Sequence, residues 1–328
     1  MKIALLWLFR ALVAALFLFS GLIKVNDVSG FAYKLEEYFW VFEKNFGLPA
    51  APFVAASFAL AAFIAVFETA LAFALIFGVL PSFTAWALLI MIVFFTFLTG
   101  YSWITESVTD CGCFGDAIKL TPFQSFVKDV ILTVVIGYIF VLRKSIRPPT
   151  SDKIARASAA TLSLLTAFLT WYCYRYLPIK DFLPACKGCD FKKNATFMDA
   201  EGNTKLHGYA PVEECGFDEF SGKTLFVVVR DLAEASEEDL KTAVELTNAL
   251  VGGEVKPVFL ISAISRDVEA FKAKYAPRAC ISVQDATMLK TIVRSNPGYI
   301  LLNDGVVKQK WSKAAAPTRE KLLSAARD

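Results

Sequence analysis

Asp110-Cys111-Gly112-Cys113-Phe114-Gly115-Asp116 is a short polar stretch between two apolar runs, each long enough to cross a membrane. It contains two thiols one residue apart, and its glycines let the backbone turn tightly. Thiols in such a turn at the edge of a bilayer are difficult to explain by packing alone. The function of the chain therefore depends on which side of the membrane this stretch faces and on which other thiols it can meet.

The apolar residues are concentrated in the first half of the chain. Of the 328 residues, 56% are hydrophobic, too many for an ordinary soluble protein, and the net charge of +3 gives no basic field for nucleic acid. Five apolar runs predict membrane-spanning helices at residues 3–25, 53–77, 83–103, 121–142 and 154–177. The segment 24–49, rich in Tyr, Phe and Glu, is typical of an amphipathic segment at the membrane interface.

Basic residues predict the orientation. The connection after the fourth run carries Arg143, Lys144, Arg147, Lys153 and Arg156, opposed only by Asp152. Short basic connections stay in the cytoplasm. Counting crossings from there places the N-terminus in the cytoplasm, and both the Cys111–Cys113 stretch and residues 179–328 outside. Six of the seven cysteines then lie where disulfides persist, and Cys173 lies within a helix.

The C-terminal half has the composition of an α/β domain. Runs rich in β-formers at 225–230, 257–262, 280–283, 299–302 and 306–311 are separated by helical spacing at 236–251, 266–275 and 286–294, and a last helix is expected at 317–326. Asn303-Asp304-Gly305 predicts a hairpin turn. This is the element order of a thioredoxin fold, and Asn296-Pro297 lies where that fold keeps a cis-proline, although the sequence leaves the isomer open.

We therefore expect three parts. Residues 1–145 form a four-helix membrane bundle, and residues 146–178 form a basic linker with a fifth transmembrane helix. Residues 179–328 form a thioredoxin-like α/β domain outside the membrane. One feature departs from a redox thioredoxin: the place of its CxxC motif reads Arg230-Asp231-Leu232-Ala233-Glu234, without cysteine. The domain is then a binding module, or it uses other thiols.

Residues 1–145 resemble the DoxX/MauE superfamily of small membrane proteins. The matching positions are Ser20-Gly21, Lys24, Asp27, Glu68, Cys111-Gly112-Cys113-Phe114-Gly115, Leu120-Thr121 and Lys128-Asp129. Residues 220–312 resemble the thioredoxin-like extension of such proteins in Bacteroidetes, through Ser295-Asn296-Pro297-Gly298 and the hairpin turn. MauE-type proteins are linked to maturation of a disulfide-rich periplasmic amine dehydrogenase, and their membrane fold is thought similar to vitamin K epoxide reductase. The resemblance implies an inner membrane, a periplasmic C-terminal domain and, by the reductase analogy alone, a quinone as electron acceptor.

Two cysteine pairs are the candidate redox thiols. Cys111 and Cys113 suit thiol exchange, but they equally suit a structural staple, and a metal site is disfavoured because His ligands are absent nearby. Cys186 and Cys189 frame Lys187 about nine residues beyond the fifth helix, and a positive charge favours a reactive thiolate. A structural disulfide is the alternative there, and the zinc-ligand set is incomplete.

Charged residues within the apolar runs are the other candidates, because intramembrane charges are usually paired or functional. Arg10, Lys24 and Glu68 are the positions concerned. Counted from the cytoplasmic ends of their helices, Arg10 and Glu68 lie at comparable depth, about 10–14 Å in. We expect these two to form a buried ion pair of mainly structural importance. His207, the only histidine, is expected at the surface.

Three functions are compatible with these observations. The first is a membrane component of periplasmic thiol–disulfide handling or protein maturation, using the two cysteine pairs. The second is a scaffold that binds an exported protein through its thioredoxin-like domain, with all disulfides structural. A small-molecule transporter is third, because intramembrane polar groups are few and no repeat of broken helices is present.

Overall fold

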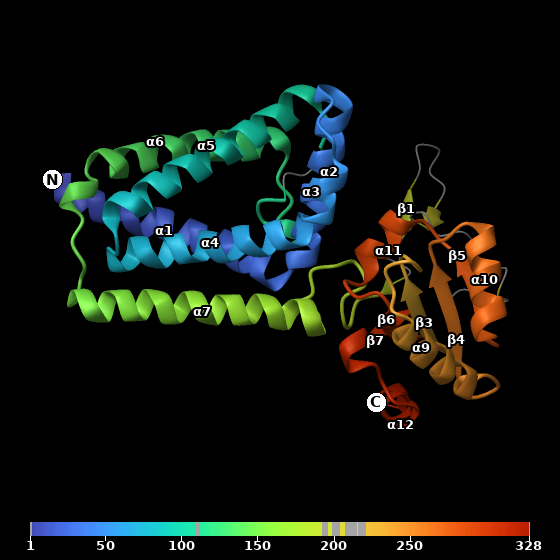
Figure 1. Cartoon of the computed structure of the whole chain (residues 1–328). Helices are drawn as coiled ribbons and strands as arrows, with labels where there is room; N and C mark the ends of the chain where they lie inside the picture. Colours follow the sequence, from blue (N-terminus) through green and yellow to red (C-terminus); the bar gives the residue numbers. More distant parts are fainter. Residues whose placement is uncertain are drawn as a thin grey trace. The chain divides into compact units, whose positions relative to one another are not determined.

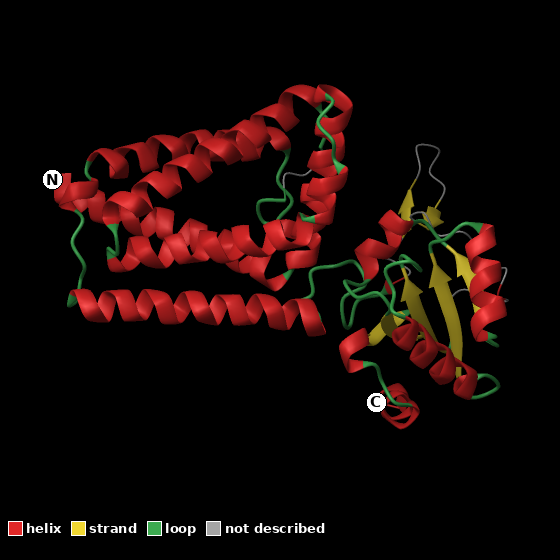
Figure 2. Ribbon diagram, viewed as in Figure 1, coloured by secondary structure: helices red, strands yellow, loops and turns green. Residues whose placement is uncertain are grey.

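The computed structural model describes residues 2–108, 112–191, 196–198, 204–206, 215 and 221–327. The chain divides into two compact units, Met1–Tyr174 and Arg175–Asp328. The first unit is helical, and the second combines a sheet with helices (Figure 2). The predicted fold class, a helical membrane part followed by an α/β part, is confirmed.

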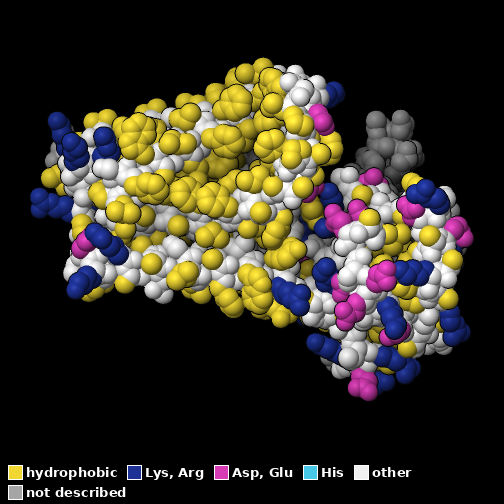
Figure 3. All heavy atoms as spheres, in the orientation of Figure 1, with side chains coloured by type: hydrophobic (Ala, Val, Ile, Leu, Met, Phe, Trp, Pro, Cys, Tyr) yellow, Lys and Arg dark blue, Asp and Glu magenta, His cyan; other side chains and the backbone are white. Residues whose placement is uncertain are grey.

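Among the described residues, five helices are long and apolar enough to cross a membrane: α1 (Lys2–Asn26), α4 (Ser57–Phe77), α5 (Pro81–Thr105), α6 (Pro122–Val141) and α7 (Asp152–Tyr176). They match the five predicted runs. Helix α1 packs against α4 and α5 against α6, while α7 runs beside this bundle (Figure 1). Apolar side chains cover the length of the helices, and Lys and Arg side chains gather at the end with the N-terminus and the α6–α7 connection (Figure 3).

Helix α6 begins where its sequence predicts. The Thr121 hydroxyl accepts from the Gln124 amide at 3.3 Å, and the Gln124 side chain accepts from the Thr121 amide at 3.0 Å. This capping box satisfies two amide groups that the helix cannot satisfy internally. It fixes the point at which the segment between α5 and α6, which contains the short helix η1 (Gly115–Ala117), returns to the membrane bundle.

The predicted interfacial segment is the amphipathic helix α2 (Val28–Phe46), followed by the short α3 (Ala51–Ala55). Figure 1 shows α2 lying across one end of the bundle. Asp27 caps it by accepting from the Gly30 amide at 2.9 Å. Its buried apolar residues follow helical spacing: Val28, Phe31, Ala32, Leu35 and Tyr38. The short helix η2 (Arg143–Ser145) precedes α7 at the opposite end.

The second unit is built on a five-stranded sheet of order β5-β4-β3-β6-β7. Its strands are β3 (Lys223–Val229), β4 (Val255–Ile261), β5 (Cys280–Val283), β6 (Gly298–Asn303) and β7 (Val306–Ser312). Strands β3, β4 and β5 run parallel, whereas β6 is antiparallel to both β3 and β7. A separate antiparallel pair joins β1 (Thr196–Met198) and β2 (Thr204–Leu206). All five predicted strands of the main sheet are present.

Helices cover both faces of this sheet: α9 (Glu237–Leu250), α10 (Ser265–Tyr275), α11 (Ala286–Ile292) and α12 (Arg319–Arg327), with the short η4 (Lys313–Ala315). Alternate residues of β3 supply the two cores, because successive side chains of a strand point to opposite faces. Leu225 and Val227 pack with α9 and α12, and Phe226 and Val228 pack with α11. The Asn296–Pro297 peptide bond before β6, whose isomer the sequence left open, is cis.

Candidate functional site

A buried ion pair lies where α1 meets α4. The Lys24 ammonium is 2.9 Å from the Glu68 carboxylate, and their side chains are 2% and 4% exposed. Lys24 also donates to the Ser20 hydroxyl at 2.6 Å. Its third acceptor is the carbonyl oxygen of Cys113, at 3.1 Å. An ammonium has three N–H donors, so Lys24 is fully hydrogen-bonded.

The same contacts fix the thiol-containing segment to the membrane bundle. Ser20 donates to the Cys113 carbonyl at 2.9 Å, so this oxygen accepts from both Ser20 and Lys24. Cys113 is 9% exposed and packs with Ile23 and Phe114. The Phe114 ring lies 5.6 Å from that of Phe19 on α1. Cys111, the other predicted thiol of this pair, lies outside the described residues.

A second ion pair faces the same region from α6. Lys128 donates to the Asp129 carboxylate, and Thr99 of α5 donates to the other Asp129 oxygen at 3.1 Å. Asp129 is 1% exposed. Asp129 was not among the predicted site residues, although an acid within the apolar run of α6 is a sufficient signal for one.

A small cavity of about 30 Å³ lies between the two ion pairs. Its polar lining comes from Ser20, Lys24, Glu68, Lys128 and Asp129, and Cys113 and Phe114 also line it. This volume is sufficient for a water molecule, which needs roughly 10–15 Å³. Two lysines balance two carboxylates, so the site is neutral while its groups remain polar.

The predicted Arg10–Glu68 ion pair is wrong. Arg10 instead donates to the carbonyl oxygens of Leu75 and Ile76, at 2.9 and 3.3 Å. These carbonyls belong to the last turn of α4, where backbone acceptors have no partner within the helix. The Arg10 guanidinium also lies 4.0 Å from the centre of the Trp7 ring. Arg10 therefore caps the C-terminus of α4, a favourable position for a cation.

Depth along each helix alone does not show which residues meet. The predicted pair requires that α1 and α4 reach the same level at that end of the bundle. Arg10 is 14 residues before Lys24, or about 21 Å along the helix axis. Since Lys24 is the residue beside Glu68, Arg10 lies far beyond reach of that carboxylate.

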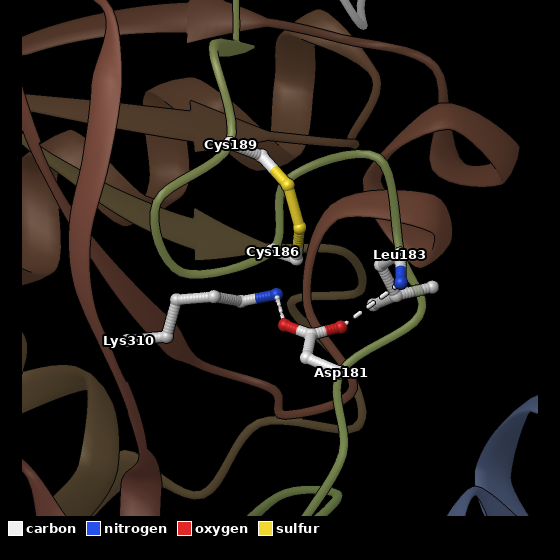
Figure 4. Close-up of a disulfide and its surroundings, with 5 residues drawn as sticks. All are labelled: Asp181, Leu183, Cys186, Cys189 and Lys310. Atoms are coloured by element: carbon white, nitrogen blue, oxygen red, sulfur yellow. Dashed lines mark hydrogen bonds and ion pairs between the residues drawn. A yellow bond between two sulfur atoms is a disulfide. The ribbon is translucent and has the colours of Figure 1, made fainter.

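The second predicted thiol pair is a disulfide between Cys186 and Cys189 (Figure 4). Backbone hydrogen bonds join this segment to the start of β7: Gly188 donates to Val307 at 2.7 Å, and Val307 donates to Cys189 at 3.0 Å. Asp181 accepts from Lys310 at 2.6 Å and from the Leu183 amide at 3.0 Å. The segment is thus held on the sheet edge by contacts other than the disulfide, and both cysteines are half-buried.

Cys215 and Cys280 form another disulfide, which was not predicted from the sequence. It joins residues 65 positions apart. The chain-entropy model assigns roughly 4 kcal/mol of stabilisation to a loop of this length and roughly 2 kcal/mol to the short Cys186–Cys189 loop. Cys215–Cys280 is therefore the more important structural bridge. The even number of cysteines outside the membrane was the only signal for it.

Hydrogen bonds tie residues 230–231, which follow β3, to the segment that precedes β6. The Asn296 side chain, next to the cis-proline, donates to the Asp231 carbonyl at 2.8 Å and accepts from the Arg230 amide at 3.1 Å. It ties the end of β3 to the start of β6. The Cys186–Cys189 disulfide lies at the opposite end of these strands, beside the hairpin that joins β6 to β7.

In the part of the chain that the structure describes, no three His, Cys, Asp or Glu side chains are grouped to hold a metal ion. His207 lies outside the described residues. An apolar groove of about 420 Å³ lies between α4 and α5, and Phe95 lines both this groove and the cavity beside Cys113.

The comparisons with known proteins concern the membrane bundle. Residues 2–142 match the family described as methylamine utilisation protein MauE. No curated protein and no solved structure matches the chain. The matched residues contain α1 to α6, with Lys24, Glu68 and Cys113, so this bundle is MauE-like. The likeness to DoxX proteins and to the Bacteroidetes extension stays a prediction.

Proposed function

We propose that this MauE-like membrane protein takes part in thiol–disulfide exchange for the maturation of exported proteins. The membrane-side pair is Cys111 and Cys113, and the pair on the C-terminal domain is Cys186 and Cys189. The observation that carries this proposal is the anchoring of Cys113: two buried donors, from Ser20 and Lys24, hold its backbone beside a polar cavity. A purely structural link between α1 and the Cys113 segment would not require the buried ammonium group of Lys24.

The Cys186–Cys189 disulfide has the properties of an exchangeable bridge. It closes a short loop, and the Lys310–Asp181 ion pair and backbone hydrogen bonds hold the segment independently. Reduction would then leave the fold of the domain intact. A thiolate from one pair attacks a sulfur of the other pair's disulfide, and a mixed disulfide forms as the old bond breaks. The second thiolate of the attacking pair then releases the reduced pair, so one disulfide is consumed and one is formed.

Both pairs are compatible with reaction at one membrane surface. The Phe58 ring at the start of α4 lies 4.1 Å from Tyr174, so α7 ends at the same end of the bundle as the Cys113 segment. Cys186 follows the last residue of α7, Tyr176, by ten residues, a length that spans at most about 35 Å. The tether therefore limits how far Cys186 can lie from the end of α7.

A quinone is the electron acceptor that we propose from the reductase analogy. Oxidation of two thiols by a quinone gives a disulfide and a quinol, so electrons and protons balance. The groove between α4 and α5 supports this choice, because it is lined by apolar and aromatic side chains and adjoins the Cys113 cavity through Phe95. Such linings are typical of sites for apolar ligands.

Trapping of mixed disulfides in cells tests the exchange. Cys113→Ser and Cys189→Ser each leave one thiol without its internal partner. We expect Cys111 or Cys186 in these variants to capture a disulfide-linked exported protein or the other pair, visible after alkylation on non-reducing gels. The scaffold function would be favoured by two results together. All cysteine pairs of the wild-type protein would stay fully oxidised under mild reductant, and neither variant would form an adduct.

One observation favours that second function. We propose that the α/β domain is thioredoxin-like, from its strand order and its cis-proline, and Asn296 closes its usual redox position. A domain of this kind binds a partner without dithiol chemistry of its own. Under the scaffold function, serine at all four candidate thiols should leave partner binding unchanged, whereas exchange requires the thiols.

A further inference from the structure

We propose that Lys24 is a positioning residue for the Cys113 segment, in addition to being the ion-pair partner of Glu68. The inference rests on the proposed thiol–disulfide exchange and assigns Lys24 a task within it. It starts from one juxtaposition: a buried ammonium donates both to a carboxylate on α4 and to the backbone of a candidate redox cysteine.

The hydrogen bonds of Lys24 exceed what helix pairing needs. Joining α1 to α4 requires only the contact with Glu68. The other two donors of the ammonium go to Ser20 and to the Cys113 carbonyl, and Ser20 donates to that same carbonyl. The carbonyl oxygen therefore accepts two hydrogen bonds from neighbouring donors. The arrangement holds one backbone atom of the thiol segment with two hydrogen bonds.

Fixing this carbonyl affects the sulfur atom on the same residue. Exchange requires a thiolate to approach a disulfide sulfur along a defined line, and a bound geometry close to that line removes an entropic cost. A displacement of about 1 Å in a reacting group can lower a rate by about 100-fold. Cys113 is also buried against Ile23 and Phe114, so its side chain has little freedom once the backbone is fixed.

Glu68 neutralises the charge of the buried Lys24 ammonium. An unpaired ammonium in apolar surroundings is strongly destabilising, and it is retained only when a carboxylate neutralises it. Glu68 contacts the Lys24 ammonium, and Lys24 in turn contacts the Cys113 carbonyl. The two residues therefore have separable tasks: Glu68 neutralises and Lys24 positions.

The test replaces the pair in a way that preserves folding. In Lys24→Met with Glu68→Leu, both charges are removed together, and apolar replacement of a buried pair is often neutral for stability. Full-length protein in detergent is reduced, desalted and mixed with glutathione disulfide. Samples are alkylated over time, and the oxidation of the peptide with Cys111 and Cys113 is followed by mass spectrometry. We expect oxidation at least tenfold slower than in wild type, at unchanged accumulation.

Two further variants separate positioning from folding. Ser20→Ala keeps the ion pair and removes one donor to the carbonyl, so oxidation should slow about threefold, and Ser20→Thr should restore it. Arg10→Met removes a buried cation far from the thiols, and its rate should stay within twofold of wild type even if less protein accumulates. If the double variant does not accumulate, Ser20→Ala decides.

The outcomes distinguish this inference from the function on which it rests. Wild-type rates in the double variant or in Ser20→Ala would overturn the positioning role alone. A wild-type pair that does not react with glutathione disulfide at all would overturn the proposed exchange, and the positioning role with it.

Discussion

Gly21 of α1 lies so close to Thr69 of α4 that a methyl group on Gly21 would come within 2.6 Å of the Thr69 Cγ2 atom and 3.2 Å of its backbone nitrogen. This approach brings the next turn of α1, with Lys24, against Glu68. It also places Ser20 within hydrogen-bonding distance of the Cys113 carbonyl. The helix contact at Gly21 therefore sets the geometry of the whole buried cluster.

Gly21→Ala should separate the two helices slightly. The added methyl group would clash with the Thr69 side chain and contact its backbone tightly, and overpacking of this kind costs about 1–3 kcal/mol. We expect a lower unfolding midpoint in detergent and faster alkylation of Cys113, measured peptide by peptide. The matched control is Gly137→Ala on α6, where the added methyl group contacts nothing within 4 Å. An equal loss in both variants would contradict the close-contact explanation.

The Lys24–Glu68 pair should respond to partner removal as a buried pair does. Glu68→Gln alone leaves the ammonium without its carboxylate and should destabilise by about 3–5 kcal/mol. Adding Lys24→Gln should recover part of this loss, whereas adding Arg10→Gln should give an additive loss, because Arg10 does not contact Glu68. Detergent-unfolding midpoints measure the coupling, and coupling with Arg10 in place of Lys24 would contradict the structure.

The two disulfides should differ in their effect on stability. We expect Cys280→Ser to destabilise the C-terminal domain by roughly 4 kcal/mol and Cys189→Ser by roughly 2 kcal/mol, since the lost loop constraint grows with loop length. Pulse proteolysis of the full chain in detergent across a urea series gives both values. A larger loss for Cys189→Ser would argue that this bridge is structural and weaken the proposed exchange.

Tyr299 should make the α/β domain sensitive to alkaline pH. Burial in β6, with a smaller contribution from Asp239, raises the pKa of its hydroxyl above the usual value near 10. A raised folded-state pKa means that the stability contribution is complete below about pH 10 and is lost as the pH rises from there, because the unfolded chain ionises first. Thermal unfolding between pH 8 and 11 should show this loss in wild type and a smaller one in Tyr299→Phe.

The proposed orientation places the basic end of the bundle in the cytoplasm and residues 179–328 in the periplasm of an inner membrane. Protease added to spheroplasts should then remove the C-terminal domain while the α6–α7 connection stays protected. A cysteine introduced at Ser151 should be unreactive to a membrane-impermeant maleimide until the cells are opened. Protection of the C-terminal domain from the protease would falsify this topology. The cysteines would then no longer be expected in a compartment that permits disulfides.

The sequence by itself determined the elements of both units. Five apolar runs gave five helices, because a membrane span is a local property of length and composition. The capping box at Thr121 and the turn at Asp304 and Gly305 were equally local, and both formed as predicted. The order of strands and helices along the α/β part followed from alternating strand and helix signals and a final hairpin.

Only the tertiary structure decided which polar residues meet. Lys24 and Glu68 are 44 residues apart, and Ser20 and Cys113 are 93 apart, so no local pattern relates them. Their contact depends on the register of α1 against α4, which the packing of Gly21 against Thr69 sets. In the same register, Arg10 lies beside the last turn of α4 and not beside Glu68. The position of a residue along one helix can be counted from the sequence. The axial offset between two helices depends on how their surfaces pack.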